Sequence, residues 1–535
     1  MLCQKKIEIK TSVDAYNWIT QFNGTVDRDN LEIFEFTFAP ITCKQLVITG
    51  NDMALCENWL YSFSIASVEV YDEIGRNIAL HSKGACVTTS SVNHLSQNER
   101  GPEVYNWLLQ MDLGMKWARI GYHDDPINWH WVERKKGELK MDPMAEDAID
   151  ILYENNINIV YCLNFGNRLY EGYSERKFPQ LKEWYYENPR PPKSEEALKA
   201  WDRYVEFSVN YFKDRVHYFE IWNEWNGEAY WGDFPDVEHF IMLVKRTIPI
   251  IKRCAPDAKI VLGSSDQFVH ERNAENGNQH VKMFYKALDE LAPLVDAIGY
   301  HPFYQPAVDG ERYLNYTENF NNFKNYCESK GFKGNMYMAS EVAVGAMYPP
   351  IIKGTTNCWW GNDGEVNYSE IQKAKLLTQL NVKHTALGIQ LMICELSNHD
   401  YPLELSLLRK GFDTYPIQAT NPNMAYYATR NLCTILDGYE GTNFNYTCSN
   451  NENMEIFCLE REHNKALALW KTHTLDDFCE GQMVNIKLDF LVDNAHAYNV
   501  INGEVVKLDL VKTDTTTLIN GVIVRDGPII IEMDI

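Results

Sequence analysis

The sequence predicts an α/β protein, a (β/α)8 (TIM) barrel flanked by N-terminal and C-terminal β-sandwich-like domains. In the middle of the chain, short apolar runs typical of buried strands alternate with longer runs of helical periodicity, a pattern typical of a parallel sheet covered by helices. On both sides of this region, apolar and polar residues alternate with a period of two, which indicates antiparallel strands. The 535 residues also exceed what one hydrophobic core usually spans, so several domains are expected.

The first region, residues 1–85, is predicted to be a β-sandwich. The sequence FTFAPITCKQLVITGN, followed by SIASVEVYD, resembles the second half of a discoidin-type, galactose-binding-like domain. The Arg usual in the middle of that strand is replaced here by Lys44, Gln45 and Leu46, so a structural role is favoured over glycan binding. The alternating runs that predict strands are residues 6–9, 31–38, 45–49 and 67–71.

The middle region, residues 86–436, is predicted to form the barrel. Eight strand-like runs are separated by helical patterns, as a (β/α)8 barrel with enlarged loops requires. The predicted strands are residues 87–93, 116–122, 157–164, 217–224, 259–264, 296–302, 335–341 and 387–395. The clearest helical patterns are residues 144–155, 194–212, 237–253 and 368–385.

The last region, residues 437–535, returns to short alternating strands and is predicted to be a second β-sandwich or a small sheet packed on the barrel. Asn502-Gly503 is the strongest short signal for a β-hairpin in this region. Asp526-Gly527 has the same chemistry and predicts another hairpin.

Composition argues against several classes of partner. Lys and Arg number 50 and Asp and Glu number 74, giving a formal net charge of −24 that repels nucleic acid and anionic membrane surfaces. No apolar stretch is long enough to cross a membrane. The 13 cysteines lack metal-ligand spacing and are expected to be free thiols in a reducing compartment. Because no apolar segment follows the basic start, we expect a cytoplasmic protein, although a secreted protein trimmed of its signal would look the same.

Two glutamates end predicted barrel strands, the position at which barrel enzymes carry their catalytic groups. Glu224 lies in YFEIWNEWN and Glu341 closes NMYMASE. Hydrolysis of a glycoside needs two carboxyl groups flanking the scissile bond, one protonated and one ionised. Glu220 precedes Glu224 by four residues and faces the same way but deeper, so it is expected to be a buried charge paired with an inward Arg or His.

The Trp-Asn-Glu motif at a strand end, the later strand-closing Glu, and the run GMKWARIGYHDDPINWHWVERKKGEL together resemble the clan A retaining glycoside hydrolases. Family 39, the β-xylosidase and α-L-iduronidase group, is the most similar, over residues 86–436. The resemblance implies that Glu224 is the acid/base and that Glu341 is the nucleophile. It also implies that Asn223 contacts the sugar hydroxyl beside the anomeric carbon and that Arg119 keeps Glu341 ionised.

The sequence departs from the family at two strands. The sixth strand of the family commonly ends in His-x-Tyr, whereas here His301 is followed by Phe303 and Tyr304. Either Tyr304 takes the role of that Tyr through a bulge or the contact is lost, and His301 is either a sugar ligand or a structural group. The eighth strand lacks the usual Trp, and Glu395 near its end either adds a third carboxyl group or pairs with a neighbouring base.

Asn164, at the end of the third strand, and Trp131, in the loop after the second, complete the predicted substrate-binding set. Other tryptophans in predicted loops are candidates either for stacking on sugar or for loop packing: Trp129, Trp225, Trp231, Trp359 and Trp360.

The predicted function is retaining hydrolysis of an equatorial glycosidic bond by double displacement, exo-acting and β-xylosidase-like, on an oligosaccharide or glycoside. The chain has no G-x-S-x-G, P-loop, H-E-x-x-H or C-x-x-C motif, so no metal and no organic cofactor are expected. An endo-acting glycanase or a transglycosylase would use the same glutamates. A noncatalytic carbohydrate-binding barrel is the alternative that the altered sixth and eighth strands favour.

Overall fold

The chain divides into two compact units, Met1–Asn98 and Glu99–Ile535. The computed structural model describes residues 5–13, 18–26, 36–43, 45–51, 70, 111–121, 125–171, 190–227, 236–265, 279–302, 314–342, 369–393, 407–410, 419–472 and 475–535. No helix in these ranges is long and apolar enough to cross a membrane. The cysteines they contain form no disulfide with one another.

The first unit contains an antiparallel sheet of order β2-β1-β3, formed by β1 (Lys5–Ser12), β2 (Ile19–Val26) and β3 (Gln45–Asn51). Two of its strands were predicted, and Ile7 and Ile9 are the buried apolar residues of β1. The prediction of a strand over residues 31–38 is wrong for its described end, because residues 36–38 carry no strand. Phe36 instead packs its ring 4.6 Å from that of Phe22. Of residues 67–71, only Val70 is described, and it lies in no strand.

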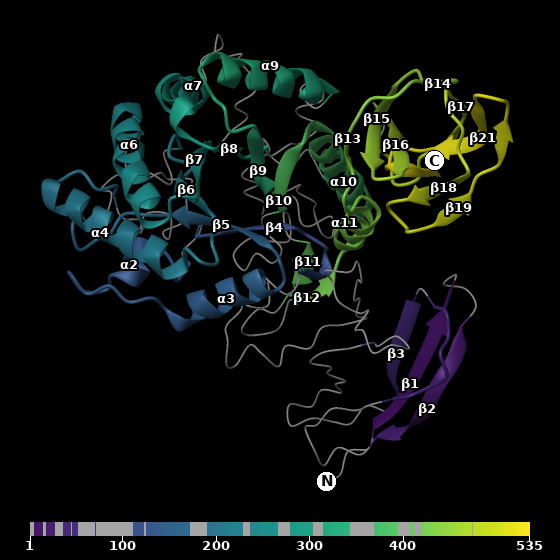
Figure 1. Ribbon diagram of the computed structural model, residues 1–535, viewed down its shortest axis with the longest axis horizontal. Helices are drawn as coiled ribbons and strands as arrows, with labels where there is room; N and C mark the ends of the chain where they lie inside the picture. The colour runs from purple at the N-terminus through teal and green to yellow at the C-terminus, as the bar shows by residue number, and fades with distance from the viewer. Residues whose placement is uncertain are drawn as a thin grey trace, which may run out of the picture. The chain divides into compact units, whose positions relative to one another are not determined.

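The second unit contains the predicted barrel. Among the described residues, seven parallel strands each pair with the next along the chain, and the last lies against the first, so that the sheet is nearly closed (Figure 1). The predicted first strand, residues 87–93, lies outside the described residues. The strands are β4 (Trp117–Ile120), β5 (Asn158–Leu163), β6 (Tyr218–Asn223), β7 (Lys259–Ser265), β8 (Ala297–Tyr300), β9 (Met336–Val342) and β10 (Ile389–Ile393).

Helices lie on the outside of this sheet (Figure 1). Polar residues that precede them accept hydrogen bonds from first-turn amides, as Asp142, Ser194 and Asp236 do, which explains where these helices begin. All four predicted helices are present. The barrel helices are α2 (Trp129–Val132), α3 (Pro143–Glu154), α4 (Glu195–Phe212), α6 (Val237–Cys254), α7 (Gln279–Leu291), η4 (Ala292–Leu294), α9 (Tyr316–Ser329) and α10 (Glu370–Leu387).

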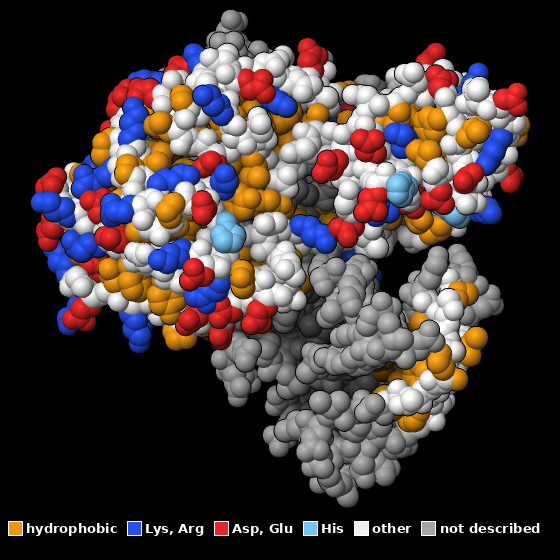
Figure 2. Space-filling model, viewed as in Figure 1, with side chains coloured by type: hydrophobic (Ala, Val, Ile, Leu, Met, Phe, Trp, Pro, Cys, Tyr) orange, Lys and Arg blue, Asp and Glu red, His pale blue; other side chains and the backbone are white. Residues whose placement is uncertain are grey.

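The outer faces of these helices mix charges of both signs (Figure 2). Ion pairs join neighbouring helices there, for example Lys245 of α6 and Glu290 of α7, whose charged groups are 2.6 Å apart. Inside the barrel, a small apolar layer occupies the middle and lower parts of the strands, formed by Val160, Val261, Ala297 and Met338. Described polar residues such as Arg119 and Glu341 lie further along their strands, toward the carboxyl ends.

After a short hairpin of β11 (Leu408–Lys410) and β12 (Ala419–Pro422), helix α11 (Met424–Ile435) leads into the C-terminal strands. These form two sheets, of order β13-β15-β16-β22-β18-β19 and β14-β17-β21-β20, whose apolar faces pack on each other as a sandwich. The strands are β13 (Glu440–Gly441), β14 (Tyr446–Cys448), β15 (Met454–Arg461), β16 (Asn464–Lys471), β17 (Gln482–Leu488), β18 (Asn494–Asn499), β19 (Val505–Lys507), β20 (Leu510–Lys512), β21 (Thr517–Val524) and β22 (Ile529–Asp534).

The two predicted hairpins of this sandwich have different outcomes. Asn502-Gly503 does join the antiparallel pair β18 and β19, with Gly503 at a φ of 73°. The hairpin predicted at Asp526-Gly527 is wrong, because β21 and β22 belong to different sheets. Asp526 is fully buried, and its carboxylate accepts a hydrogen bond from the amide of Asp476 and pairs with Lys375 of α10 at 2.6 Å. The turn therefore ties the sandwich to a barrel helix.

Helix α10 is buried on all sides because it packs between barrel strand β10 and the sandwich strands β13 and β15. Two of its lysines are paired across this junction, Lys375 with Asp526 and Lys383 with Glu455, each at 2.6 Å. Burial lowers the pKa of Lys383 below its usual value, although the charge of Glu455 acts to raise it.

Candidate active site

Polar side chains from four barrel strands meet at the carboxyl ends of the strands. Arg119 comes from β4, Glu220 and Asn223 from β6, and Glu341 from β9, while Glu224 and His301 follow directly after β6 and β8. All six residues are buried, Glu224 with 6% and Glu341 with 7% of their surface exposed. The sequence-predicted catalytic pair and three of its predicted neighbours are thus brought together.

Arg119 is the centre of this cluster. Its Nε donates to Oε2 of Glu220 at 2.5 Å, its Nη1 to Oε1 of Glu341 at 2.7 Å, and its Nη2 to Oδ1 of Asn223 at 2.7 Å. Nη2 also lies 3.8 Å from the Sγ atom of Cys162. The planar guanidinium therefore fixes two carboxylates and an amide relative to one another.

The charges of the cluster hold Arg119 protonated. Burial acts to lower its pKa, but the charge of Glu220, the charge of Glu341 and the hydrogen bond to Glu220 outweigh burial and raise the pKa above its usual value. Burial, followed by the charge of Glu220, raises the pKa of the Cys162 thiol, so this group stays neutral. Glu341 consequently faces a permanent cation.

His301 connects the two predicted catalytic glutamates. Its Nδ1 lies 2.8 Å from Oε1 of Glu224 and 3.6 Å from Oε2 of Glu341. One ring nitrogen of His301 and one oxygen from each of the two carboxyl groups all lie within 4.8 Å of one another. His301 is fully buried and touches both carboxyl groups, which favours the structural reading of this residue over the sugar-ligand reading.

An irregular backbone places Glu224. Trp222 and Glu224 have positive φ values of 70° and 42°, which interrupts the alternation of the strand. As a result, Glu220 and Asn223, three residues apart, both reach Arg119. Gly263 of β7 makes room for this kink, since a Cβ there would lie 2.2 Å from the carbonyl oxygen of Ile221.

Glu341 is placed by a comparable irregularity. Between two ladder pairs, Leu391 with Ala339 and Ile393 with Val342, β9 contains one residue more than β10. This extra residue is a bulge that changes which side chains face the interior, so Glu341 reaches Arg119. Both glutamates thus follow a local break in strand geometry, a feature that residue periodicity does not reveal.

Asn164 directly follows strand β5 and contacts the backbone of the site. Its Nδ2 donates to the carbonyl oxygen of Gly121, and its Oδ1 accepts a hydrogen bond from the amide of Asn223 at 2.9 Å. Both ends of the side chain therefore hold backbone, which gives Asn164 a positioning role. Its predicted role as a sugar ligand remains a prediction.

The tryptophans near the site mostly belong to the core. Trp225 is fully buried and stacks on Phe240 with ring centroids 4.0 Å apart, and Trp129 is also fully buried. Packing rather than stacking on sugar is therefore the correct reading for these two, and Trp129 and Trp131 lie in helix α2 rather than in a loop as predicted. Trp131 is half-buried, with the guanidinium of Arg134 4.6 Å above its ring. The remaining predicted residues lie outside the described residues: Tyr304, Glu395, Trp231, Trp359 and Trp360.

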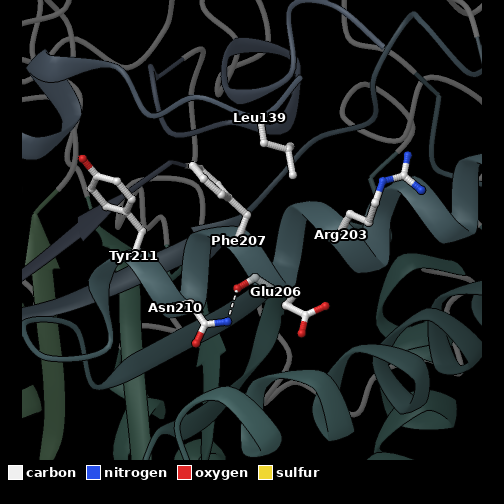
Figure 3. Close-up of a pocket in the computed structure, with 6 residues that line it drawn as sticks. All are labelled: Leu139, Arg203, Glu206, Phe207, Asn210 and Tyr211. Atoms are coloured by element: carbon white, nitrogen blue, oxygen red, sulfur yellow. Dashed lines mark hydrogen bonds between the residues drawn. The ribbon is translucent and has the colours of Figure 1, made fainter. Parts of the chain in front are cut away.

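Glu224, His301 and Glu341 are also donor types that bind divalent metal ions, and they form the one such cluster within the described ranges. A separate hollow lies on helix α4 and contains none of the candidate residues (Figure 3). It is lined by Leu139, Arg203, Glu206, Phe207, Asn210 and Tyr211.

The fold and this cluster define the class: a TIM barrel with a paired-carboxyl site at its C-terminal face and a β-sandwich following it. Among solved structures, the chain shares its fold with a family 39 glycoside hydrolase from the gut symbiont Bacteroides cellulosilyticus WH2, at a TM-score of 0.54 and 13% identity, over 99% of this chain and 94% of the other. A monomeric β-xylosidase from Caulobacter crescentus CB15 matches with a TM-score of 0.52 and 12% identity, over 82% and 93% of the two chains. A glucosidase from Croceicoccus marinus matches with a TM-score of 0.51 and 10% identity, over 80% and 91%. Comparison with protein-family models and with the sequences of curated proteins finds no match.

Proposed function

We propose that the chain is a retaining glycoside hydrolase in which Glu224 is the acid/base and Glu341 the nucleophile. The observation that carries the proposal is the pair of buried carboxyl groups with oxygens within 4.8 Å of each other at the carboxyl ends of the barrel strands. Retaining enzymes hold their carboxyl groups about 5–5.5 Å apart, whereas inverting enzymes leave about 6.5–9.5 Å for a water molecule. One oxygen of each group lies within 4.8 Å of one oxygen of the other, which agrees with the shorter separation and so supports double displacement.

The environment of each carboxyl group supports its role. Glu341 accepts a hydrogen bond from Arg119, whose charge favours the ionised form that a nucleophile needs. Two close carboxyl groups do not ionise together easily, so the proton of the pair resides on Glu224. His301, 2.8 Å from Glu224, orients that carboxyl group.

Catalysis then proceeds in two steps. Glu224 gives its proton to the glycosidic oxygen while Glu341 attacks the anomeric carbon, so the alcohol leaves and a glycosyl ester forms on Glu341. Glu224, now ionised, removes a proton from water, which attacks the same carbon and releases Glu341. Two inversions give a sugar of retained configuration.

The substrate that we propose is a glycoside with an equatorial bond, cleaved from a chain end. The fold neighbours include proteins described as a β-xylosidase and as a glucosidase, which supports aryl β-xylosides and β-glucosides as first substrates. An endo-acting glycanase with the same two glutamates is the alternative within the class.

A panel of aryl glycosides tests the proposal, with proton NMR of the first sugar released. We expect cleavage of at least one β-glycoside, a first product of β configuration, and loss of cleavage in Glu341→Gln. A first product of α configuration would contradict the retaining assignment. Binding of sugars without cleavage of any panel member would favour the noncatalytic carbohydrate-binding barrel.

A further inference from the structure

Two carboxyl groups suffice for the proposed reaction, yet a third lies directly beneath them. The side chain of Glu220 has no exposed surface, and its Oε2 accepts from Nε of Arg119 at 2.5 Å. Burying a carboxylate is costly unless a cation and hydrogen bonds compensate for the lost water. Arg119 thus serves two carboxylates with one charge, and the mechanism above uses only one of them.

We propose that Glu220 is a positioning residue that fixes the guanidinium of Arg119 and offsets part of its charge, so that Glu341 is ionised but remains a good nucleophile. The proposal rests on the proposed function. It assigns Glu220 no contact with substrate, since its side chain has no exposed surface and it lies within strand β6, four residues before Glu224.

The geometry supports the positioning part. Glu220, Glu341 and Asn223 each take a different nitrogen of Arg119, at 2.5–2.7 Å, so the plane of the guanidinium is defined by three partners. Of these, Glu341 loses its negative charge when one of its oxygens bonds to carbon, so its attraction to Arg119 weakens during the proposed reaction. Glu220 is the charged anchor that holds Arg119 while Glu341 changes its bonding.

The charge supports the second part. Glu341 faces the charged and titratable groups Arg119 of β4, Cys162 of β5, Glu220 and Glu224 of the β6 segment, and His301 after β8. With Glu220 ionised, the Arg119–Glu220 pair acts on Glu341 as a dipole rather than as an isolated cation. A carboxylate next to an isolated cation is stabilised further, and attack on carbon then becomes more difficult.

Replacing Glu220 by Gln keeps an oxygen for Nε of Arg119 but removes one negative charge. Loss of that charge favours the ionised form of both Glu341 and Glu224. The acidic limb of the kcat/KM profile, which reports the nucleophile, and the basic limb, which reports the acid/base, should therefore both move to lower pH. A neighbouring charge typically moves a carboxyl pKa by about 1 unit or more, so a shift of about one pH unit is expected.

The experiment compares pH profiles of the full-length wild type, Glu220→Gln and Glu220→Asp on the best aryl glycoside. The proposal expects both limbs to shift in the Gln variant, with kcat reduced at least tenfold, and neither limb to shift in the Asp variant, which keeps the charge. Glu133→Gln is the matched control, because Glu133 is also fully buried but is held by Trp129, Gly137 and Tyr170. Both limbs of the kcat/KM profile of Glu133→Gln should stay where they are in the wild type.

A fall in kcat with unmoved limbs in Glu220→Gln, or equal shifts in the Gln and Asp variants, would overturn the proposal. If Glu220→Gln does not fold, the Asp variant decides. A shift of either limb of its kcat/KM profile would overturn the proposal, and unmoved limbs with a reduced kcat would support it. Failure of the proposed function is distinguishable: the wild type would then cleave nothing. In that case a carbon-13 NMR titration of labelled Glu341, in the wild type and in Glu220→Gln, tests the effect of Glu220 on Glu341. The proposal requires the Glu341 carboxyl group to titrate at lower pH in the variant.

Discussion

At the scale of single residues, Arg119 organises the site because a guanidinium offers N–H donors in several directions within one plane. Lysine would supply the same charge but only a point-like donor. Glu220, Asn223 and Glu341 occupy three of these directions, and their positions relative to one another depend on that plane. The planar shape of the guanidinium, as well as its charge, therefore fixes the positions of these three side chains.

Arg119→Lys tests this distinction. The ammonium cannot bond all three partners in the same geometry, so we expect kcat/KM to fall by about 100-fold or more, since misplacement of about 1 Å costs that much. Loss of the buried network should also lower the free energy of unfolding by a few kcal/mol, roughly the cost of breaking a buried ion pair. Activity assays and denaturant unfolding measure both effects. Arg253→Lys, at an exposed ion pair with Glu206, is the control, and equal activity in both variants would show that charge alone matters.

At the scale of elements, strand β6 leads into Glu224, the proposed acid/base, through a kinked backbone, and its neighbour β7 accommodates the kink. The carbonyl oxygens of Ile221 and Trp222 approach the place where Gly263 would carry a Cβ, at 2.2 and 2.6 Å. Such contacts are too close for any side chain. Gly263 thereby permits the positive φ of Trp222 and the inward direction of Asn223.

Gly263→Ala should displace the backbone at the end of β6 and with it Glu224. We expect kcat/KM to fall by about 10- to 100-fold and stability to fall by roughly 1–3 kcal/mol through overpacking. Gly481→Ala is a suitable control, because its Cβ would meet the side chain of Ile523, which is exposed and can move. Unchanged activity of Gly263→Ala, with stability lowered as in the control, would separate Gly263 from the site.

Sequence periodicity predicts the barrel strands well because their apolar runs are continuous and bounded by polar residues. It also predicts Glu220 as a buried charge paired with an inward Arg or His, and that partner is Arg119. It does not predict the positive φ of Trp222 or the bulge at Glu341, since both depend on contacts with neighbouring strands. The turn at Asp526 was misassigned for a similar reason: its chemistry suits a hairpin, but its buried salt bridge to Lys375 directs the chain to the other sheet.

At the scale of the whole second unit, the barrel and the C-terminal sandwich are joined through helix α10 by buried ion pairs. Lys383 has no exposed side-chain surface, and Glu455 is 16% exposed. Replacing a buried ion pair with apolar residues of similar size is often neutral or stabilising, because the charges no longer lose their hydration. The lowered pKa of Lys383 shows that burial outweighs the attraction of Glu455.

Lys383→Met with Glu455→Leu should therefore be as stable as the wild type at neutral pH, or more stable by roughly 1–4 kcal/mol. The folded-state pKa of Lys383 lies below its unfolded value of 10.5, so the unfolded wild type binds more protons than the folded one between these two values. Wild-type stability thus rises with pH across that window, and the advantage of the double variant should shrink as the pH approaches 10.5. Urea unfolding at pH 7 and at alkaline pH checks the sign, and an advantage that grows with pH would contradict it.

The roles of Glu341 and Glu224 are tested most directly by azide rescue, because it reports the stereochemistry of each step. Glu341→Gly should not turn over, and azide should restore cleavage of an activated aryl glycoside to give a glycosyl azide of inverted configuration. Glu224→Ala should still form the glycosyl-enzyme from good leaving groups, which need little protonation, and azide should release a product of retained configuration. The same azide stereochemistry from both variants would contradict the assignment of Glu341 as nucleophile and Glu224 as acid/base.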